Sequence, residues 1–318
     1  MKAAVVSSFG APPRYQDFPD PVPAREDEIV VDVLAAGLHP RVRSQADGSH
    51  YTSTDELPLV PGIDGVGRGP DGLLRYFILP DTTLGAMAEQ TIIDTRRSIV
   101  LPSGSDPVAV AAGMNPAMSS WVALRRRVQF QKGQDVLILG ATGNAGQLAV
   151  QIAKLSGADR IVAAGRDAGR LARLPAVGAT STVSLDREPA SVARELGRAA
   201  GDVDVVIDYL WGEPTSAAMI AVVTGRADRG KPLTWIEIGS IAGPAAQIPS
   251  AALRAARLTI VGSGQGSVSV PEYLAELPAL AEVITVGTLD VDARAIPLAD
   301  VEQAWATTGT TQRIVLTP

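Results

Sequence analysis

The sequence predicts an α/β protein of two domains, one rich in short β-strands and one built on a parallel sheet. The chain has 318 residues, and a domain usually takes roughly 100 to 200. Short β-like runs broken by Gly and Pro fill the first third and the tail. Between them, short apolar runs alternate with amphipathic segments of helical length. This alternation predicts a parallel sheet covered by helices, because parallel neighbours need crossover connections.

The β-rich part comes first along the chain. Its strand-like runs lie at 3–6, 28–34, 66–69, 73–79, 89–93 and 98–101. Short strand-like runs occur again after residue 287, with a helix predicted at 298–307 and a last strand at 312–316. We expect this tail to fold back onto the first part. The predicted domains are therefore 1–116 with 288–318, and 117–287.

The middle of the chain opens with a β-α-β unit. It consists of a strand at 135–139, a helix at 145–156 and a strand at 160–164. Further strands are predicted at 203–208, 233–238 and 258–261, with segments of helical pattern between them. This order is typical of a doubly wound parallel sheet.

Composition excludes several classes of partner and site. Hydrophobic residues make up 46% of the chain and charged residues 19%, which predicts a soluble globular protein. The formal net charge of −6 and the lack of a long basic tract argue against a nucleic-acid partner. With no Cys, disulfides and thiolate chemistry are excluded, and we expect a cytoplasmic protein. No export signal or membrane span is visible, so no membrane partner is expected.

A glycine-rich turn joins the first strand and helix of the β-α-β unit. Gly140 and Gly143 allow a tight turn and close approach to a pyrophosphate, and Gly146 lets the helix pack on the strand. The helix N-terminus adds N–H groups for an anion. We therefore predict a dinucleotide site, against the alternative of a structural turn. Its residues here are Gly140, Thr142, Gly143, Asn144, Ala145 and Gly146.

The end of the next strand favours NADPH over NADH as the cofactor. An NAD site places an acidic residue there, whereas this chain has Gly165 and Arg166. Glycine leaves room for a phosphate, and a guanidinium can bind it with two hydrogen bonds. Asp167 follows, and this acidic residue leaves NAD as an alternative cofactor. Arg170 and Arg173 are either further phosphate contacts or part of a solvated helix face.

Two later strands contribute to the same predicted site. Gly239 and Ser240 follow one of them, and Ser263 and Gly264 follow the other. Ligands of parallel sheets bind at the carboxyl ends of the strands. We therefore include these four residues among the cofactor-binding candidates.

Six segments in order carry a resemblance to a known family. They are Met-Lys-Ala at 1–3, Ala-Ala-Gly-Leu-His-Pro at 35–40, Pro-Gly-Ile-Asp-Gly-Val-Gly at 61–67, Leu-Gly-Ala-Met-Ala-Glu at 84–89, Asn-Pro-Ala-Met-Ser-Ser-Trp at 115–121 and the glycine turn at 140–146. With them the chain resembles the zinc-free medium-chain dehydrogenase/reductase superfamily, in its quinone oxidoreductase branch. The resemblance implies a GroES-like partial β-barrel around a Rossmann domain. It also implies a homodimer paired through the edge of the Rossmann sheet, near 258–261 and 283–286.

The comparison with zinc-dependent relatives predicts that no metal is used. Those relatives have a Cys ligand where this chain has His39, and a Gly-His-Glu motif where it has Gly62, Ile63 and Asp64. Ile63 cannot bind zinc, and the chain has only two His and no Cys. Hydride addition to a quinone or an α,β-unsaturated carbonyl gives a delocalised enolate that a few hydrogen-bond donors can stabilise. The predicted function is therefore NADPH-dependent reduction of a small hydrophobic quinone or enone. The alternatives are an NADPH-binding sensor or structural protein without turnover, and an enoyl-thioester reductase.

The catalytic candidates lie in the β-rich domain. His39 replaces an Asn of the family and could donate to the enolate oxygen or bind the nicotinamide ribose; alternatively it is bonded to backbone in a turn. Enoyl-thioester reductases of the superfamily carry a proton-donating Tyr where this chain has His50, with Tyr51 one residue beyond. Either of these two could be the donor, or neither.

The resemblance also gives roles to residues just before the Rossmann domain. Ser119 aligns with a Thr near the nicotinamide carboxamide, and Asn115 lies one turn before it. The alternative for both is helix capping and packing. Asp64 and Glu89 are interpreted as structural partners of a turn and a strand.

Overall fold

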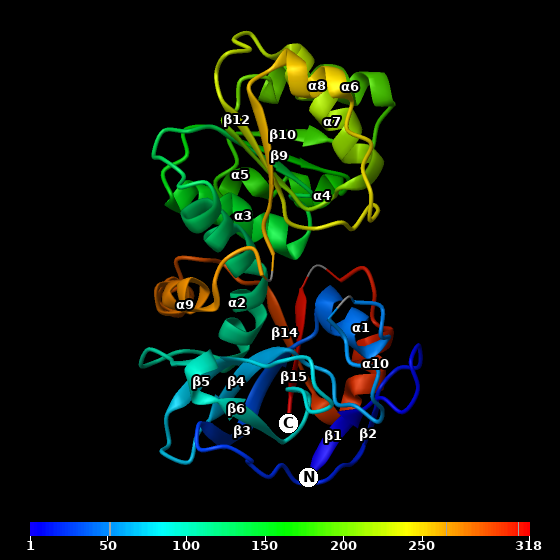
Figure 1. The fold of residues 1–318 in the computed structure, drawn as a ribbon, viewed down its shortest axis with the longest axis vertical. Coiled ribbons are helices and arrows are strands. Elements are labelled where there is room, and N and C mark those ends of the chain that lie inside the picture. The colour runs from blue at the N-terminus through cyan, green and yellow to red at the C-terminus, as the bar shows by residue number, and fades with distance from the viewer. Residues whose placement is uncertain (51, 265, 311) are drawn as a thin grey trace. The chain divides into compact units, whose positions relative to one another are not determined.

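The computed structural model describes residues 1–50, 52–264, 266–310 and 312–318, and the chain forms two compact units. The first unit comprises Met1–Asn115 and Leu274–Pro318, and the second comprises Pro116–Tyr273. Helix α2 (Pro107–Val122) and helix α9 (Val270–Thr285) each contain one of the two boundaries. The β-rich unit is thus discontinuous along the chain (Figure 1).

The second boundary lies at residue 274, whereas the sequence placed it at residue 288. The reason is the packing of the C-terminal half of α9 within the first unit. The Thr285 hydroxyl lies 2.8 Å from the Ser105 hydroxyl. A Cβ at Gly113 would lie only 3.1 Å from the side chain of Ile284. These contacts tie the segment before residue 288 to the start of α2, which sequence periodicity does not reveal.

The first unit contains a mostly antiparallel sheet in the order β14-β15-β3-β4-β5-β7, with β6 paired to β3; β14 and β15 are parallel. Its strands, with β1 and β2 as a separate antiparallel pair, are β1 (Lys2–Val5), β2 (Arg14–Asp17), β3 (Glu28–Gly37), β4 (Asp64–Arg68), β5 (Leu74–Ile78), β6 (Gln90–Asp94), β7 (Ser98–Val100), β14 (Ala293–Pro297) and β15 (Arg313–Thr317). Its other elements are α1 (Pro40–Ala46), η1 (Thr95–Arg97), η3 (Leu298–Asp300) and α10 (Val301–Ala306). All six strand-like runs of the β-rich part form strands, while β2 and α1 were not predicted. Helix α1 has only seven residues, which is too short for a clear periodicity.

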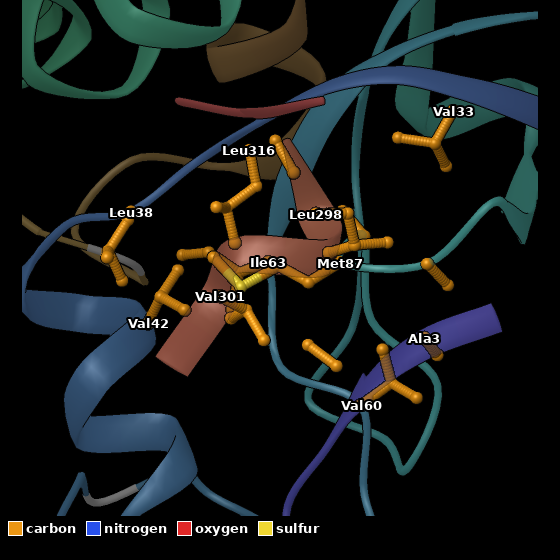
Figure 2. Close-up of a cluster of buried hydrophobic side chains, with 14 of the residues drawn as sticks. Ala3, Val33, Leu38, Val42, Val60, Ile63, Met87, Leu298, Val301 and Leu316 are labelled. Atoms are coloured by element: carbon orange, nitrogen blue, oxygen red, sulfur yellow. The ribbon is translucent and has the colours of Figure 1, made fainter. Parts of the chain in front are cut away.

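An apolar core fixes the two loops that carry polar residues of interest in the first unit. Figure 2 shows Leu38, after β3, and Ile63, before β4, among the clustered side chains of this core. They are 5% and 3% exposed. His39 and Asp64 directly follow these two anchors, so burial of the apolar neighbours holds both polar side chains inside the unit.

The second unit contains a parallel sheet in the order β10-β9-β8-β11-β12-β13. Its strands are β8 (Val136–Leu139), β9 (Ile161–Gly165), β10 (Ser181–Ser184), β11 (Val205–Asp208), β12 (Leu233–Glu237) and β13 (Leu258–Gly262). Its helices are η2 (Ala123–Arg127), α3 (Asn144–Leu155), α4 (Ala168–Leu171), α5 (Leu174–Val177), α6 (Pro189–Ala200), α7 (Gly212–Gly225) and α8 (Ser250–Ala255). Counted along the chain, the strand order is that of a Rossmann domain. The predicted α/β class with a doubly wound parallel sheet is confirmed.

Candidate functional site

The carboxyl edge of the parallel sheet gathers most of the residues predicted to bind a cofactor. The chain order reverses between β8 and β11, and such a switch point is where ligands bind in these sheets. The predicted residues that directly follow or end a strand at this edge are Gly140 after β8, Gly165 and Arg166 at the end of β9, Gly239 and Ser240 after β12, and Ser263 and Gly264 after β13. The topology thus brings residues that are far apart in the sequence to one edge.

The three glycines of the turn are needed for different reasons. Gly140 has φ +84°, a conformation that L side chains rarely adopt. A Cβ at Gly146 would lie 2.2 Å from the carbonyl oxygen of Gly140, so only glycine lets α3 pack on the turn. Gly143 has neither constraint, since its φ is −78° and a Cβ there would meet only the Gly140 oxygen at 3.5 Å. The fold itself therefore explains the first and third glycines but not the second.

The N-terminus of α3 is suited to binding an anion. Gly143 is its N-cap residue, and no side chain caps the helix. The backbone N–H of Gln147 donates to the Gly143 carbonyl at 2.9 Å, which begins the helical hydrogen bonds. The N–H groups of Asn144, Ala145 and Gly146 precede that bond and have no intrahelical acceptor. Together with the helix dipole, they form a positive end at the switch point.

Of the arginines that follow β9, Arg170 contacts this turn. The Arg170 Nη1 donates to the carbonyl of Thr142 at 2.8 Å, so this arginine is tied to the glycine turn and is not merely a solvated helix face. Asp167 caps α4 by accepting the backbone N–H of Arg170 at 2.9 Å. Arg166 is exposed. Gly165 also has a packing reason to be glycine, because a Cβ there would lie 2.5 Å from Thr142 Cγ2.

Ser119 and Tyr209 are linked at the same edge of the second unit. The Ser119 hydroxyl donates to the Pro116 carbonyl at 2.7 Å and lies 2.9 Å from the Tyr209 hydroxyl. Since Ser119 has one proton to donate, Tyr209 is the donor to it. Burial raises the pKa of Tyr209 to about 12, so the phenol stays protonated. Asn115 lies on the same helix, at the end of the first unit's opening segment.

Asp208, which the sequence analysis missed, organises the loop after β11. It is fully buried, and its carboxylate accepts hydrogen bonds from backbone and side chains. The donors are the backbone N–H groups of Leu210 at 2.8 Å and Trp211 at 3.1 Å, the Thr215 hydroxyl at 2.6 Å and the Trp235 indole N–H at 2.9 Å. These bonds hold Trp211 at φ +53°, which is rare outside glycine. An acidic residue ending an apolar strand run is the signal that could have indicated this role.

In the first unit, His39 lies at the N-cap of α1 and is buried. Its Nε2 is 3.1 Å from Asp64 Oδ1, and the Tyr76 hydroxyl donates to Asp64 Oδ2 at 2.8 Å. The sequence analysis interpreted Asp64 as a structural residue, and its carboxylate does bind neighbouring side chains. One of these neighbours, His39, is itself a predicted catalytic residue. Glu89 accepts the Lys2 backbone N–H at 2.7 Å, which fits its predicted role as a strand partner.

His50 lies in the loop after α1 and has a different set of partners. Its Nδ1 accepts the backbone N–H of Thr52 at 3.2 Å and lies 3.0 Å from the Thr52 hydroxyl. That hydroxyl also accepts Arg41 Nη2 at 2.7 Å and donates to Asp81. Burial and the charge of Arg41 lower the pKa of His50. Tyr51, the other predicted donor in this loop, lies outside the described residues.

Two searches of the described residues found no feature of the kind sought. Within 1–50, 52–264, 266–310 and 312–318, no group of three or more His, Cys, Asp or Glu is arranged to hold a metal ion. In the same residues, no helix combines the length and the apolar character needed to cross a membrane.

Comparison with known proteins places the chain among oxidoreductases. Residues 145–282 match the family described as zinc-binding dehydrogenase. A probable NADPH-dependent quinone reductase of Emericella nidulans is 29% identical, and the match covers all of both chains. An NADPH-dependent alkenal/one oxidoreductase of Arabidopsis thaliana is 28% identical over 52% of this chain and 46% of its own.

A solved structure extends this likeness to the whole fold. The quinone oxidoreductase of Thermus thermophilus, also determined as a complex with NADPH, is 26% identical with a TM-score of 0.76 and full coverage of both chains. Sequence and fold thus agree over both units. These comparisons confirm the resemblance of the chain to the medium-chain dehydrogenase/reductase superfamily, in its quinone oxidoreductase branch.

Proposed function

We propose that this protein is an NADPH-dependent oxidoreductase that reduces quinones, or the activated C=C bond of α,β-unsaturated carbonyls, without a metal. The observation that carries the proposal is Gly143, whose lack of a side chain has no reason within the chain itself. It leaves the backbone open beside the uncapped N-terminus of α3, as close approach of a pyrophosphate requires. The names of the quinone and alkenal reductases among the relatives support the substrate class.

The residues at the carboxyl edge fit NADPH better than NADH. When bound, NADPH supplies the hydride. Arg166 would bind its 2′-phosphate, with Arg170 beside the turn as a second cation. Asp167, which could have held an unphosphorylated ribose, already caps α4 and lies 3.5 Å from Arg170 Nε. The nicotinamide half of the site would use Asn115, Ser119, Gly239, Ser240, Ser263 and Gly264.

The substrate also needs a proton, and the loop after α1 supplies the candidates His50 and Tyr51. The Thr52 backbone N–H can only donate, so His50 Nδ1 is its acceptor. The neutral ring has one N–H group that can donate a hydrogen bond and one nitrogen that can accept one. Such an N–H group can stabilise an enolate oxygen by donating a hydrogen bond, and the protonated ring can transfer a proton to the enolate.

NADPH oxidation with a panel of acceptors tests the proposed function. The panel contains a benzoquinone, an alkyl enone, a simple ketone and an enoyl thioester. Turnover with the quinone or the enone, and none with the ketone, is the expected result. Tight NADPH binding without turnover of any acceptor would favour a sensor, and turnover of the thioester alone would favour an enoyl-thioester reductase.

Metal independence is part of the proposal and has its own test. Ile63 stands where zinc-dependent relatives carry a ligating His, and the chain has no Cys. Dialysis against a strong chelator should leave folding and turnover unchanged. Stoichiometric zinc in the purified protein, lost together with activity, would contradict this part.

We also infer that the protein works as a homodimer in the cytoplasm. Strand β13 lies at one end of the parallel sheet, and an open edge favours pairing with a second copy. The absence of Cys suits a reducing compartment. Light scattering should return about twice the chain mass of 33.0 kDa. A mass of one chain at micromolar concentration would contradict the dimer, and cell fractionation tests the compartment.

A further inference from the structure

The polar side chains around His39 form a buried cluster of four: His39, Asp64, Tyr76 and Arg313. They are 3%, 1%, 0% and 8% exposed. Asp64 is the centre, because its Oδ1 faces His39 Nε2 at 3.1 Å and its Oδ2 accepts the Tyr76 hydroxyl at 2.8 Å. Arg313 Nη1 points to the Leu38 carbonyl at 3.5 Å, directly before His39. Residues from β4, β5 and β15 thus converge on one imidazole that follows β3.

The charges of this cluster keep the imidazole neutral. Burial lowers the pKa of Arg313 to about 10, so the guanidinium is still protonated near neutral pH, and Asp64 favours its charged form. For His39, burial lowers the pKa; Asp64 acts against this, while the positive charges of Arg313 and Arg41 add to it. One buried cation and one buried anion already balance, and a second cation on the ring is disfavoured.

The hydrogen bonds also determine which ring nitrogen carries the proton. The Asp64 carboxylate can only accept, and both of its oxygens are engaged with donors. Nε2 must therefore be the protonated nitrogen, and Nδ1 keeps its lone pair. We propose that Asp64, itself fixed by Tyr76, is a positioning residue that holds His39 in this one tautomer, so that His39 accepts a hydrogen bond from a ligand hydroxyl and is not a proton donor.

A hydroxyl is the ligand group that this nitrogen would take. Among the described residues, no hydrogen bond to Nδ1 is found, and Nδ1 is not one of their fully enclosed unpaired polar atoms. The lone pair of this nitrogen is therefore open to a donor from outside the chain. If the proposed function holds, the hydroxyl comes either from a ribose of NADPH or from the hydroquinone product. The tautomer itself does not depend on that function.

Nitrogen-15 NMR of the histidine rings tests the tautomer without any catalytic assay. The chain has only two histidines, so the full-length His50→Gln variant, labelled with ¹⁵N-histidine, reports on His39 alone. We expect protonated Nε2 and unprotonated Nδ1 at neutral pH. Asp64→Asn should move the ring toward a mixture of tautomers, since an amide can donate as well as accept. Asp71→Asn, the same change at an exposed turn of the same sheet, should leave the signals unchanged.

Two separate ligand titrations identify the hydroxyl that binds His39 Nδ1. NADP⁺ and a soluble hydroquinone are added separately to the labelled protein, and the His39 Nδ1 signal is followed. A shift with NADP⁺ indicates the ribose, and a shift with hydroquinone alone indicates the product. Where NADP⁺ binds through His39, His39→Ala should weaken its affinity by about three- to tenfold, the effect of one neutral hydrogen bond, and His39→Asn, which offers an amide oxygen, should restore part of it.

The outcomes separate this inference from the proposed function. A proton on Nδ1, or an unchanged tautomer in a folded Asp64→Asn protein, would overturn the positioning role. If Asp64→Asn does not fold, Tyr76→Phe makes the same test, because loss of its hydroxyl should shift the ring signals through Asp64. An Nδ1 that responds to neither ligand, while fluorescence shows that NADP⁺ binds, would overturn the hydroxyl contact. Failure of NADP⁺ to bind at all would count against the proposed function and leave the tautomer result standing.

Discussion

Each unit buries one aspartate at the end of a strand, and the two carboxylates have different kinds of partner. Asp64 begins β4 in the first unit and Asp208 ends β11 in the second; they are 1% and 0% exposed. Asp208 accepts only from two backbone amides, a hydroxyl and an indole, none of which titrates near neutral pH. Asp64 accepts from a tyrosine and from a histidine whose second nitrogen has no partner among the described residues.

The partners of the two carboxylates indicate a structural role for Asp208 and a role in ligand binding for Asp64. A buried carboxylate surrounded by fixed neutral donors stabilises a loop, because every bond is satisfied within the chain. A buried carboxylate that fixes the tautomer of an imidazole leaves one acceptor for a ligand. In the proposed function, the second unit accordingly contributes the backbone that binds the cofactor phosphates, and the first contributes the side chains that donate or accept protons.

The largest effect should follow loss of Asp208. Asp208→Ala leaves four donors, two of them buried, without their acceptor and releases the strained turn at Trp211. We expect a loss of about 3 kcal/mol in the free energy of unfolding. Urea denaturation measures it, with Asp186→Ala at an exposed position of the same unit as a control that should change less than about 0.5 kcal/mol. If the Asp208→Ala protein kept its stability but lost turnover, Asp208 would have a role in the reaction and the contrast with Asp64 would be wrong.

The next effect concerns His50, the proposed proton donor of the first unit. His50→Ala should lower the rate of hydride transfer by about 10- to 1000-fold, the usual range for loss of a donor to a developing oxyanion. NADPH affinity should change little. Single-turnover kinetics with a reactive enone measure the rate, and Tyr51→Phe is the parallel variant. Parent rates in both variants would show that solvent or backbone protonates the product.

Loss of Arg166 should weaken only the phosphorylated cofactor. Arg166→Ala removes charge-assisted hydrogen bonds to the 2′-phosphate and should cost about 1.5 to 3 kcal/mol of NADPH binding, with NADH unaffected. Titration calorimetry measures both cofactors. Arg173→Ala, an exposed arginine farther along the chain, is the matched control. Equal affinity of the parent protein for NADH and NADPH would contradict the prediction.

The smallest effect is the pH dependence of stability. The pKa of His39 is lowered in the folded protein, so below its ordinary value of 6.5 the unfolded chain binds a proton that the native state excludes. Stability from this group is therefore present above pH 6.5 and is lost as the pH falls below it, by at most about 1.4 kcal/mol per pH unit. Between pH 6.5 and 5.5, His39→Gln should flatten the decline, by at most about 1 kcal/mol.

His50→Gln is the control for that measurement. Burial also lowers the pKa of His50, but this ring is only partly buried, so its effect should be the smaller of the two. A larger flattening from His50→Gln than from His39→Gln would contradict the assignment of the buried ring.

Local spacing predicted the glycine turn and its strand–helix context, because these depend on neighbours within about fifteen residues. It also predicted that Arg166 and the residues after β12 and β13 share one edge, since parallel strands end together. It did not predict the boundary at residue 274, which depends on contacts of α9 with residues 105 and 113. From the sequence, Gly165 was interpreted as leaving room for a phosphate. The structure adds a second reason, because a Cβ at this position would clash with the Thr142 side chain.

The sequence by itself determined the α/β class, the order of the elements and the lack of cysteine ligands, because periodicity and composition are local properties. Only the tertiary structure decided the state of His39. Its partner Asp64 lies 25 residues away and the nearby Arg313 is on the last strand of the chain, so neither is visible in the sequence pattern around it. Burial in the core removes water as a competing partner, and a carboxylate that can only accept then fixes the proton on the facing nitrogen.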